Sequence, residues 1–144
     1  MKTQSFILAA TVAILALASS CLARAEKQPI YVQCYAPENT DLVGNRLCTA
    51  VKNKFAKNPR YELVASDATR RWTLHIISMS IDLPSIGSIG ASTQSVTLTA
   101  YNQAHEDLEV YIDSYVYLIG QDKVSTMADQ IVADTDATIS RIID

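Results

Sequence analysis

The two histidines are the side chains of this 144-residue chain best suited to transfer protons near neutral pH. His75 alternates outward within a strand-like run, while His105 stands beside Glu106 and Asp107 in a polar turn. An enzyme that uses His105 with one of these acids is therefore one hypothesis. Consecutive residues on a turn rarely converge on one ion, so we expect no metal site. No serine or cysteine stands in a nucleophile motif and no glycine-rich loop follows a strand, so we expect neither enzymatic activity nor a cofactor.

The cysteines carry chemistry of another kind. A strand over 30–35 places Cys34 on one face, and a helix that starts near Thr40 brings Cys48 back alongside it. This geometry predicts a Cys34–Cys48 disulfide, which closes a loop of about 15 residues and stabilises a small domain by roughly 3 kcal/mol. Two buried thiols or a redox pair are the alternatives, although the spacing is not Cys-x-x-Cys.

The first 25 residues indicate export. Lys2 precedes an apolar run over 6–18, and small residues follow up to Ala23 and Ala25. This layout is typical of a secretory signal peptide that is cleaved before Glu26. Thirteen residues in a helix span roughly 20 Å, less than the ~30 Å of a membrane's hydrocarbon core, so we expect no transmembrane span.

Lipidation of Cys21 is the alternative to simple cleavage. Ala18, Ser19 and Ser20 place small residues directly before Cys21, just after the apolar run. Acyl chains on Cys21 would anchor the domain to a membrane through a short tether. We therefore expect a periplasmic or secreted protein, with an outer-membrane-anchored lipoprotein as the alternative.

Composition limits the mature chain to one domain over 26–144. Hydrophobic residues make up 49% of the sequence and charged residues 19%, as in ordinary globular proteins. Without Lys2 and Arg24, 10 of the 12 basic residues remain against 15 acidic ones, which gives a net charge of −5. We therefore expect no nucleic-acid partner.

The charges are unevenly distributed along the chain. Six basic residues lie between Lys52 and Arg71, and nine acidic residues lie from Glu106 onward. Two solvated helix faces would produce this pattern. A head-to-tail contact between copies, in which the basic end of one molecule meets the acidic helix of the next, is the alternative.

Hydrophobic periodicity predicts an α+β fold of two layers. We expect helices over 40–58, capped by Asn39 or Thr40, and from Asp122 almost to the C-terminus. The element order is strand, helix, four strands, helix, and the predicted strands cover 30–35, 60–65, 72–83, 94–102 and 108–119. The first two strands should be parallel, because a helix connects them. The result is a single mixed sheet of about five strands, with both helices on one face and the other face uncovered.

Two features of the predicted sheet suggest a contact surface. In the strand over 108–119 the aliphatic residues alternate with tyrosines, so we expect the core to receive Val110, Ile112, Val116 and Leu118. The uncovered face then presents Tyr111, Tyr115 and Tyr117. A loop over 84–92 adds Ile86 and Ile89 to the residues that we expect to bind a partner.

In the strand over 72–83 we expect the inward face to switch midway, at Ile77 and Met79, through a bulge.

The chain resembles a family in its element order, in the strand Tyr61-Glu62-Leu63-Val64 after an amphipathic helix, and in the Asp67-Ala68 turn before a long strand. It is similar to the small α/β domain of bacterial envelope assembly factors, such as the N-terminal domain of TolB, the curli secretion lipoprotein CsgG and the polysaccharide-export lipoprotein PelC. The similarity covers residues 30–143.

The resemblance implies a non-catalytic scaffold that oligomerises or docks onto an envelope partner. Our first hypothesis is an exported, periplasmic binding or assembly protein that contacts a protein partner, or itself, in the cell envelope. The alternative is an inhibitor or immunity protein that blocks an exported hydrolase with the loop over 84–92.

Overall fold

The computed structural model describes residues 26–36, 41–83, 87–102 and 108–143. Its elements are β1 (Gln28–Tyr35), α2 (Leu42–Lys57), β2 (Tyr61–Leu63), β3 (Arg70–Leu83), β4 (Gly87–Asn102), β5 (Glu109–Gly120), a 3₁₀ turn (Gln121–Lys123) and α3 (Val124–Ile143). The order of strands and helices is the predicted one. No helix in these ranges is long and apolar enough to cross a membrane.

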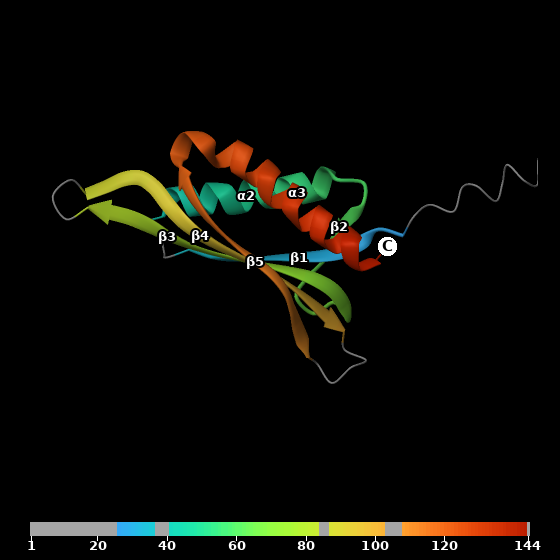
Figure 1. The fold of residues 1–144 in the computed structure, drawn as a ribbon. Coiled ribbons are helices and arrows are strands. Elements are labelled where there is room, and N and C mark those ends of the chain that lie inside the picture. Colours follow the sequence, from blue (N-terminus) through green and yellow to red (C-terminus); the bar gives the residue numbers. More distant parts are fainter. Residues whose placement is uncertain (1–25, 37–40, 84–86, 103–107, 144) are drawn as a thin grey trace, which may run out of the picture.

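One five-stranded sheet forms the first layer, in the order β2-β1-β3-β4-β5. Strand β1 runs parallel to both β2 and β3, whereas β3, β4 and β5 are antiparallel neighbours. Figure 1 shows α2 and α3 side by side on the same face of the sheet. The predicted α+β fold is confirmed, and no helix of the described part of the chain covers the opposite face, which we call the open face.

The core lies between the sheet and the two helices. Helix α2 buries a stripe that repeats every fourth residue, as predicted: Val43, Leu47, Val51 and Phe55. Phe55 meets the ring of Tyr61 edge to face, with the ring centroids 5.2 Å apart. The sheet contributes Ile30, Val32, Leu74, Ile76, Val96, Leu98 and Ile119. Helix α3 completes the core with Val124, Ala128, Ile131 and Ile139.

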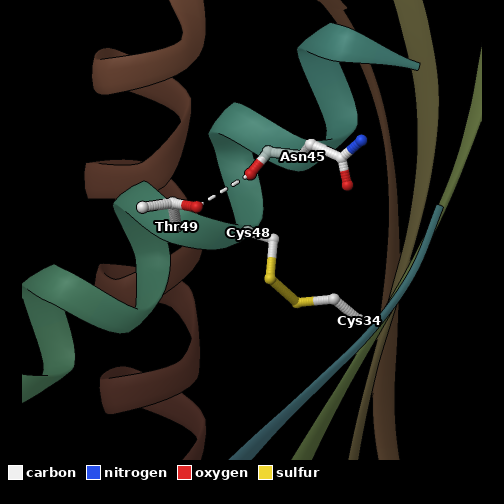
Figure 2. The surroundings of a disulfide bond; sticks show 4 residues. All are labelled: Cys34, Asn45, Cys48 and Thr49. Atoms are coloured by element: carbon white, nitrogen blue, oxygen red, sulfur yellow. Dashed lines mark hydrogen bonds between the residues drawn. A yellow bond between two sulfur atoms is a disulfide. The ribbon is translucent and has the colours of Figure 1, made fainter. Parts of the chain in front are cut away.

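A disulfide joins Cys34 of β1 to Cys48 of α2, with the two Cα atoms 6.2 Å apart (Figure 2). In the same helical turn the Thr49 hydroxyl donates a hydrogen bond of 3.0 Å to the Asn45 carbonyl. The disulfide connects the helical layer directly to the sheet, so the first strand and the first helix are cross-linked.

The basic and acidic regions of the sequence face each other within one molecule. Lys54 of α2 contacts Asp129 of α3, and Arg60 lies 2.8 Å from Asp136. Tyr61 also donates a hydrogen bond of 2.6 Å to Asp136, and burial together with this bond raises the pKa of the Tyr61 hydroxyl. These pairs account for part of the uneven charge distribution without a second copy.

Several predicted boundaries change in the structure, among them three next to a helix or a loop. Helix α2 is capped by Asp41, and not by Asn39 or Thr40, because the Asp41 side chain accepts the Gly44 amide proton. Strand β4 begins at Gly87, inside the predicted loop, because β3 and β4 still pair there beyond a bulge between Ser80 and Asp82. The 3₁₀ turn (Gln121–Lys123) separates β5 from α3, so α3 begins at Val124 and not at Asp122, where the predicted helix starts.

Candidate contact surface on the open sheet face

The open face carries an apolar half that is arranged in rows. Strand register aligns Ile77 of β3, Ser95 of β4 and Val116 of β5 in one row. The next row consists of Met79, Thr93 and Leu118. Two apolar ridges therefore run along β3 and β5, separated by a furrow of small hydroxyl residues on β4. On this half of the open face, the exposed large hydrophobic residues are Ile77, Met79, Val116, Leu118 and, at the end of β1, Tyr35.

The predicted orientation of Tyr115 and Tyr117 is wrong. Both side chains lie on the helix side of the sheet, where the Tyr117 hydroxyl donates a hydrogen bond of 2.8 Å to Asp134 of α3. The Tyr115 hydroxyl lies 2.8 Å from both Asp113 and Thr138. Burial and the neighbouring carboxylate raise the pKa of the Tyr117 hydroxyl. The two tyrosines connect β5 to α3 within the molecule.

The aliphatic residues of β5 take the position predicted for the tyrosines. Val116 is 78% exposed and Leu118 is 70% exposed, although both were predicted to enter the core. Helix α3 offers a carboxylate and a hydroxyl above the sheet, and these polar groups suit tyrosine tips better than aliphatic side chains.

A bulge explains why Tyr111 differs from the other two tyrosines of β5. The register with β4 shifts between Leu98 and Thr99, which pair with Asp113 and Tyr111, so Ile112 is the extra residue. The shift moves Tyr111 to the open face, as predicted, where it is exposed. Its hydroxyl donates a hydrogen bond of 3.1 Å to Ser114.

The other half of the open face is polar and aromatic. The Arg71 guanidinium lies 4.0 Å from the ring centroid of Tyr101 and 6.0 Å from that of Tyr31. These contacts are cation–π interactions, which fix the arginine over β1 and β4. The apolar rows are therefore bordered by a more polar surface.

His75, Thr99 and Glu109 form a small cluster between the two halves. The Thr99 hydroxyl donates a hydrogen bond of 2.6 Å to Glu109, and His75 Nε2 lies 3.4 Å from both side chains. Burial would raise the pKa of Glu109, but the hydrogen bond from Thr99 and the nearby His75 hold that pKa below its ordinary value. Because the Thr99 proton is directed to Glu109, the hydroxyl is not oriented as a nucleophile that His75 activates.

Several predicted site residues lie outside the part of the chain that the structure describes. These are Cys21, Ala23, Ala25, Ile86, and the turn residues His105, Glu106 and Asp107. Ile89 lies in β4, as far as the backbone shows. Within the described ranges, no group of three or more His, Cys, Asp or Glu side chains is arranged to hold a metal ion.

Sequence reasoning missed a buried polar network at the start of α2. Asp41 is 1% exposed and accepts hydrogen bonds from the Gly44 amide (2.8 Å), the Ser92 hydroxyl (2.5 Å) and the Ser78 hydroxyl. Gln94 donates a hydrogen bond of 2.6 Å to Ser78 in turn. Burial would raise the pKa of Asp41, but these hydrogen bonds keep that pKa below its ordinary value.

The same network shows that the inward face of β3 does not switch midway. Ser78 continues the inward series after Leu74 and Ile76, so Ile77 and Met79 stay on the open face. Polar residues at inward positions of β3 and β4 were the signal that could have revealed both the network and the apolar rows behind it.

Comparisons with known proteins give distant structural similarity only. No protein-family model and no curated protein matches the chain. A variant PelC dodecamer from Paraburkholderia phytofirmans is 16% identical over 74% of this chain and 83% of that one, with a TM-score of 0.41. The rare lipoprotein B from Shewanella oneidensis is 13% identical over 81% of this chain and 100% of that one, with a TM-score of 0.42. A minor lipoprotein from Acinetobacter baumannii is 11% identical over 79% of this chain and 94% of that one, with a TM-score of 0.34.

PelC, one of the proteins that the sequence resembles, is thus among the similar structures. Two of the three named structures are called lipoproteins, but TM-scores below 0.5 and identities of 16% or less carry no argument about function. The function has to be inferred from the residues of this chain.

Proposed function

We propose that this chain is an exported, non-catalytic assembly protein that associates with a second copy of itself through the apolar half of its open sheet face. The observation that carries the proposal is the exposure of Val116 and Leu118 beside Ile77 and Met79 on one uncovered surface. Contiguous apolar side chains on a sheet face mark contact sites in soluble proteins, since their exposure to water is unfavourable.

The shape of this surface favours a second copy. Neighbouring strands lie about 4.8 Å apart, so the ridges on β3 and β5 are roughly 10 Å apart, with one row of small residues between them. That spacing leaves room for one row of aliphatic side chains from another sheet. In a two-fold arrangement, Val116 and Leu118 of each copy would lie in the Ser95 and Thr93 furrow of the other.

The charge of this surface favours the same partner. The residues of the two rows are all uncharged, although the mature chain predicted from the sequence carries a net charge of −5. Two identical acidic molecules repel each other over most of their surfaces, so they would meet most easily where neither carries charge. A basic partner would instead be attracted to an acidic surface.

Export is part of the proposal and is supported by two features of the chain. The first 25 residues have the layout of a signal peptide, and the Cys34–Cys48 disulfide suits an oxidising compartment. The same features fit a periplasmic or secreted protein, and acylation of Cys21 would attach it to a membrane.

Sedimentation velocity over a range of protein concentrations tests the proposal. The unmodified protein should sediment as a dimer or larger species, because aliphatic burial drives the association. Val116→Asp and Leu118→Asp should each sediment as monomers, since each places a charge in the contact. Leu42→Asp is the matched control, because Leu42 is equally exposed but belongs to the helical layer.

Two outcomes would contradict the proposal. The first is a monomeric unmodified protein at all concentrations. The second is association that survives Val116→Asp and Leu118→Asp in variants whose circular dichroism shows a native fold.

A further inference from the structure

A hollow of about 680 Å³ lies on the helix side of the sheet, at the end opposite the α2 N-terminus. Its walls include Ile142 and Ile143 at the end of α3, Trp72 of β3, Val110 at the start of β5, and Leu108 just before that strand. Figure 1 shows the C-terminal end of α3 close to the beginning of β1, whose Gln28 also borders the hollow. The volume lies within the range of small-molecule sites, roughly 300 to 1,000 Å³.

We infer that this hollow binds a single-chain anionic amphiphile, with the hydrocarbon chain against Val110 and Ile142 and the anionic group on Arg70. Val110 is 57% exposed and Ile142 is 50% exposed, so the walls keep apolar surface that a hydrocarbon chain would remove from water. This site is separate from the surface that the proposed function uses, because none of the residues that line the hollow belongs to the two apolar rows of the open face.

The charge at the hollow selects an anion. Among the residues that the structure describes, its lining contains Arg70 and Arg71 and no acidic residue, and of these two it is Arg70 that shares the helix side of β3 with Trp72. In the described ranges neither arginine takes part in an ion pair. Arg71 is held over Tyr101 and donates a hydrogen bond of 2.7 Å to the Ala68 carbonyl. Arg70 is exposed, and its guanidinium can bind a carboxylate or phosphate with two hydrogen bonds.

The walls favour a hydrocarbon chain over a peptide. Val110, Ile142 and Ile143 offer no polar side-chain group, and the Trp72 indole N–H is directed to Gln28 at 3.4 Å. A peptide buried here would leave backbone amide groups without hydrogen-bond partners, which is unfavourable. A hydrocarbon chain has no such requirement.

Trp72 is the single tryptophan of the chain and lines the hollow, so its fluorescence reports on binding directly. Dibromostearic acid, whose bromine atoms quench tryptophan on contact, is the probe. Below its critical micelle concentration it should quench the protein in a saturable way. Arg70→Glu should weaken binding by about tenfold or more. Ile142→Asp should abolish saturable quenching, and Val116→Asp should leave it unchanged.

Several results would overturn the inference. The absence of saturable quenching, or unchanged quenching in Ile142→Asp, would contradict binding in the hollow. Equal quenching by a brominated non-ionic detergent would contradict the choice of an anion. Quenching by brominated phospholipid vesicles but not by the monomeric acid would contradict the choice of a single-chain ligand. Should Ile142→Asp fail to fold by circular dichroism, Val110→Asp replaces it, since Val110 reaches the hollow from β5. Monomeric protein with saturable quenching would refute the proposed association and leave this inference standing.

Discussion

Replacing Asp41 with alanine tests the buried polar network at the start of α2. The Asp41 carboxylate accepts hydrogen bonds from the Gly44 amide and from the Ser78 and Ser92 hydroxyls, in a place from which solvent is excluded. The alanine variant loses the cap of the helix and removes the acceptor of both hydroxyls.

The expected magnitude follows from these contacts. An N-cap side chain contributes about 1 kcal/mol to stability. A buried donor that loses its partner costs about 1 to 3 kcal/mol, and Asp41→Ala leaves two such donors, on Ser78 and Ser92. We therefore expect the free energy of unfolding to fall by about 3 to 7 kcal/mol, a large share of the ~5 to 15 kcal/mol of a typical domain. Asp41→Asn keeps one oxygen acceptor and should lose about 1 to 2 kcal/mol.

Equilibrium unfolding in urea, followed by Trp72 fluorescence, measures this loss as a lower transition midpoint. The pH dependence supplies a second readout. Because the pKa of Asp41 is lowered in the folded protein, its contribution is fully present above the pKa of the unfolded chain and is lost as the pH falls through the folded-state pKa. Unmodified protein should thus lose stability below about pH 4 more steeply than Asp41→Asn. A loss under 1 kcal/mol in Asp41→Ala, or identical acid profiles, would refute the reasoning.

Three further predictions concern the fold. Replacing Cys34 and Cys48 together with alanine should lower the free energy of unfolding by about 3 kcal/mol in urea, because the bond closes a loop between residues separated by 14 positions; no loss would contradict this. Gly44→Ala should lower the thermal midpoint by several degrees, since an added Cβ collides with the Ser78 side chain, and an unchanged midpoint would count against the close approach. Tyr117→Phe should cost about 1 kcal/mol of stability and leave the sedimentation coefficient unchanged, whereas a shift to monomer would restore Tyr117 as a contact residue.

The fold was largely predictable because it depends on patterns that are local. The fourfold repeat of Val43, Leu47, Val51 and Phe55 identified α2, and all four are buried. The parallel pairing of β1 with β2 follows from the connecting helix. Both features are determined by a few neighbouring residues.

The faces of β5 were not predictable in the same way, because they depend on groups far away in the sequence. Tyr117 turns inward because the carboxylate of Asp134, which is 17 residues away, accepts a hydrogen bond from the Tyr117 hydroxyl. The extra residue at Ile112 moves Tyr111 to the opposite face, and nothing in the alternation of the strand indicates that bulge. Hydrophobicity alone therefore assigned Val116 to the core, whereas the structure exposes its side chain to solvent.

The open face itself was predicted, and only its residues changed. The order of elements placed both helices on one side, so an uncovered face was expected before its composition was known. The apolar rows follow from β3 keeping its inward face, since Ser78 enters the Asp41 network and Ile77 remains outside. The buried polar network and the exposed apolar surface are thus two consequences of one strand register.

Cross-linking between two differently tagged copies tests the proposed association most directly. One copy carries Ser95→Cys in the furrow of β4, and the other carries Val116→Cys on the ridge of β5. If each ridge lies in the furrow of the other copy, mild oxidation should produce a heterodimer that contains both tags. The absence of that heterodimer, or an equal yield when Leu42→Cys replaces Val116→Cys, would contradict the account.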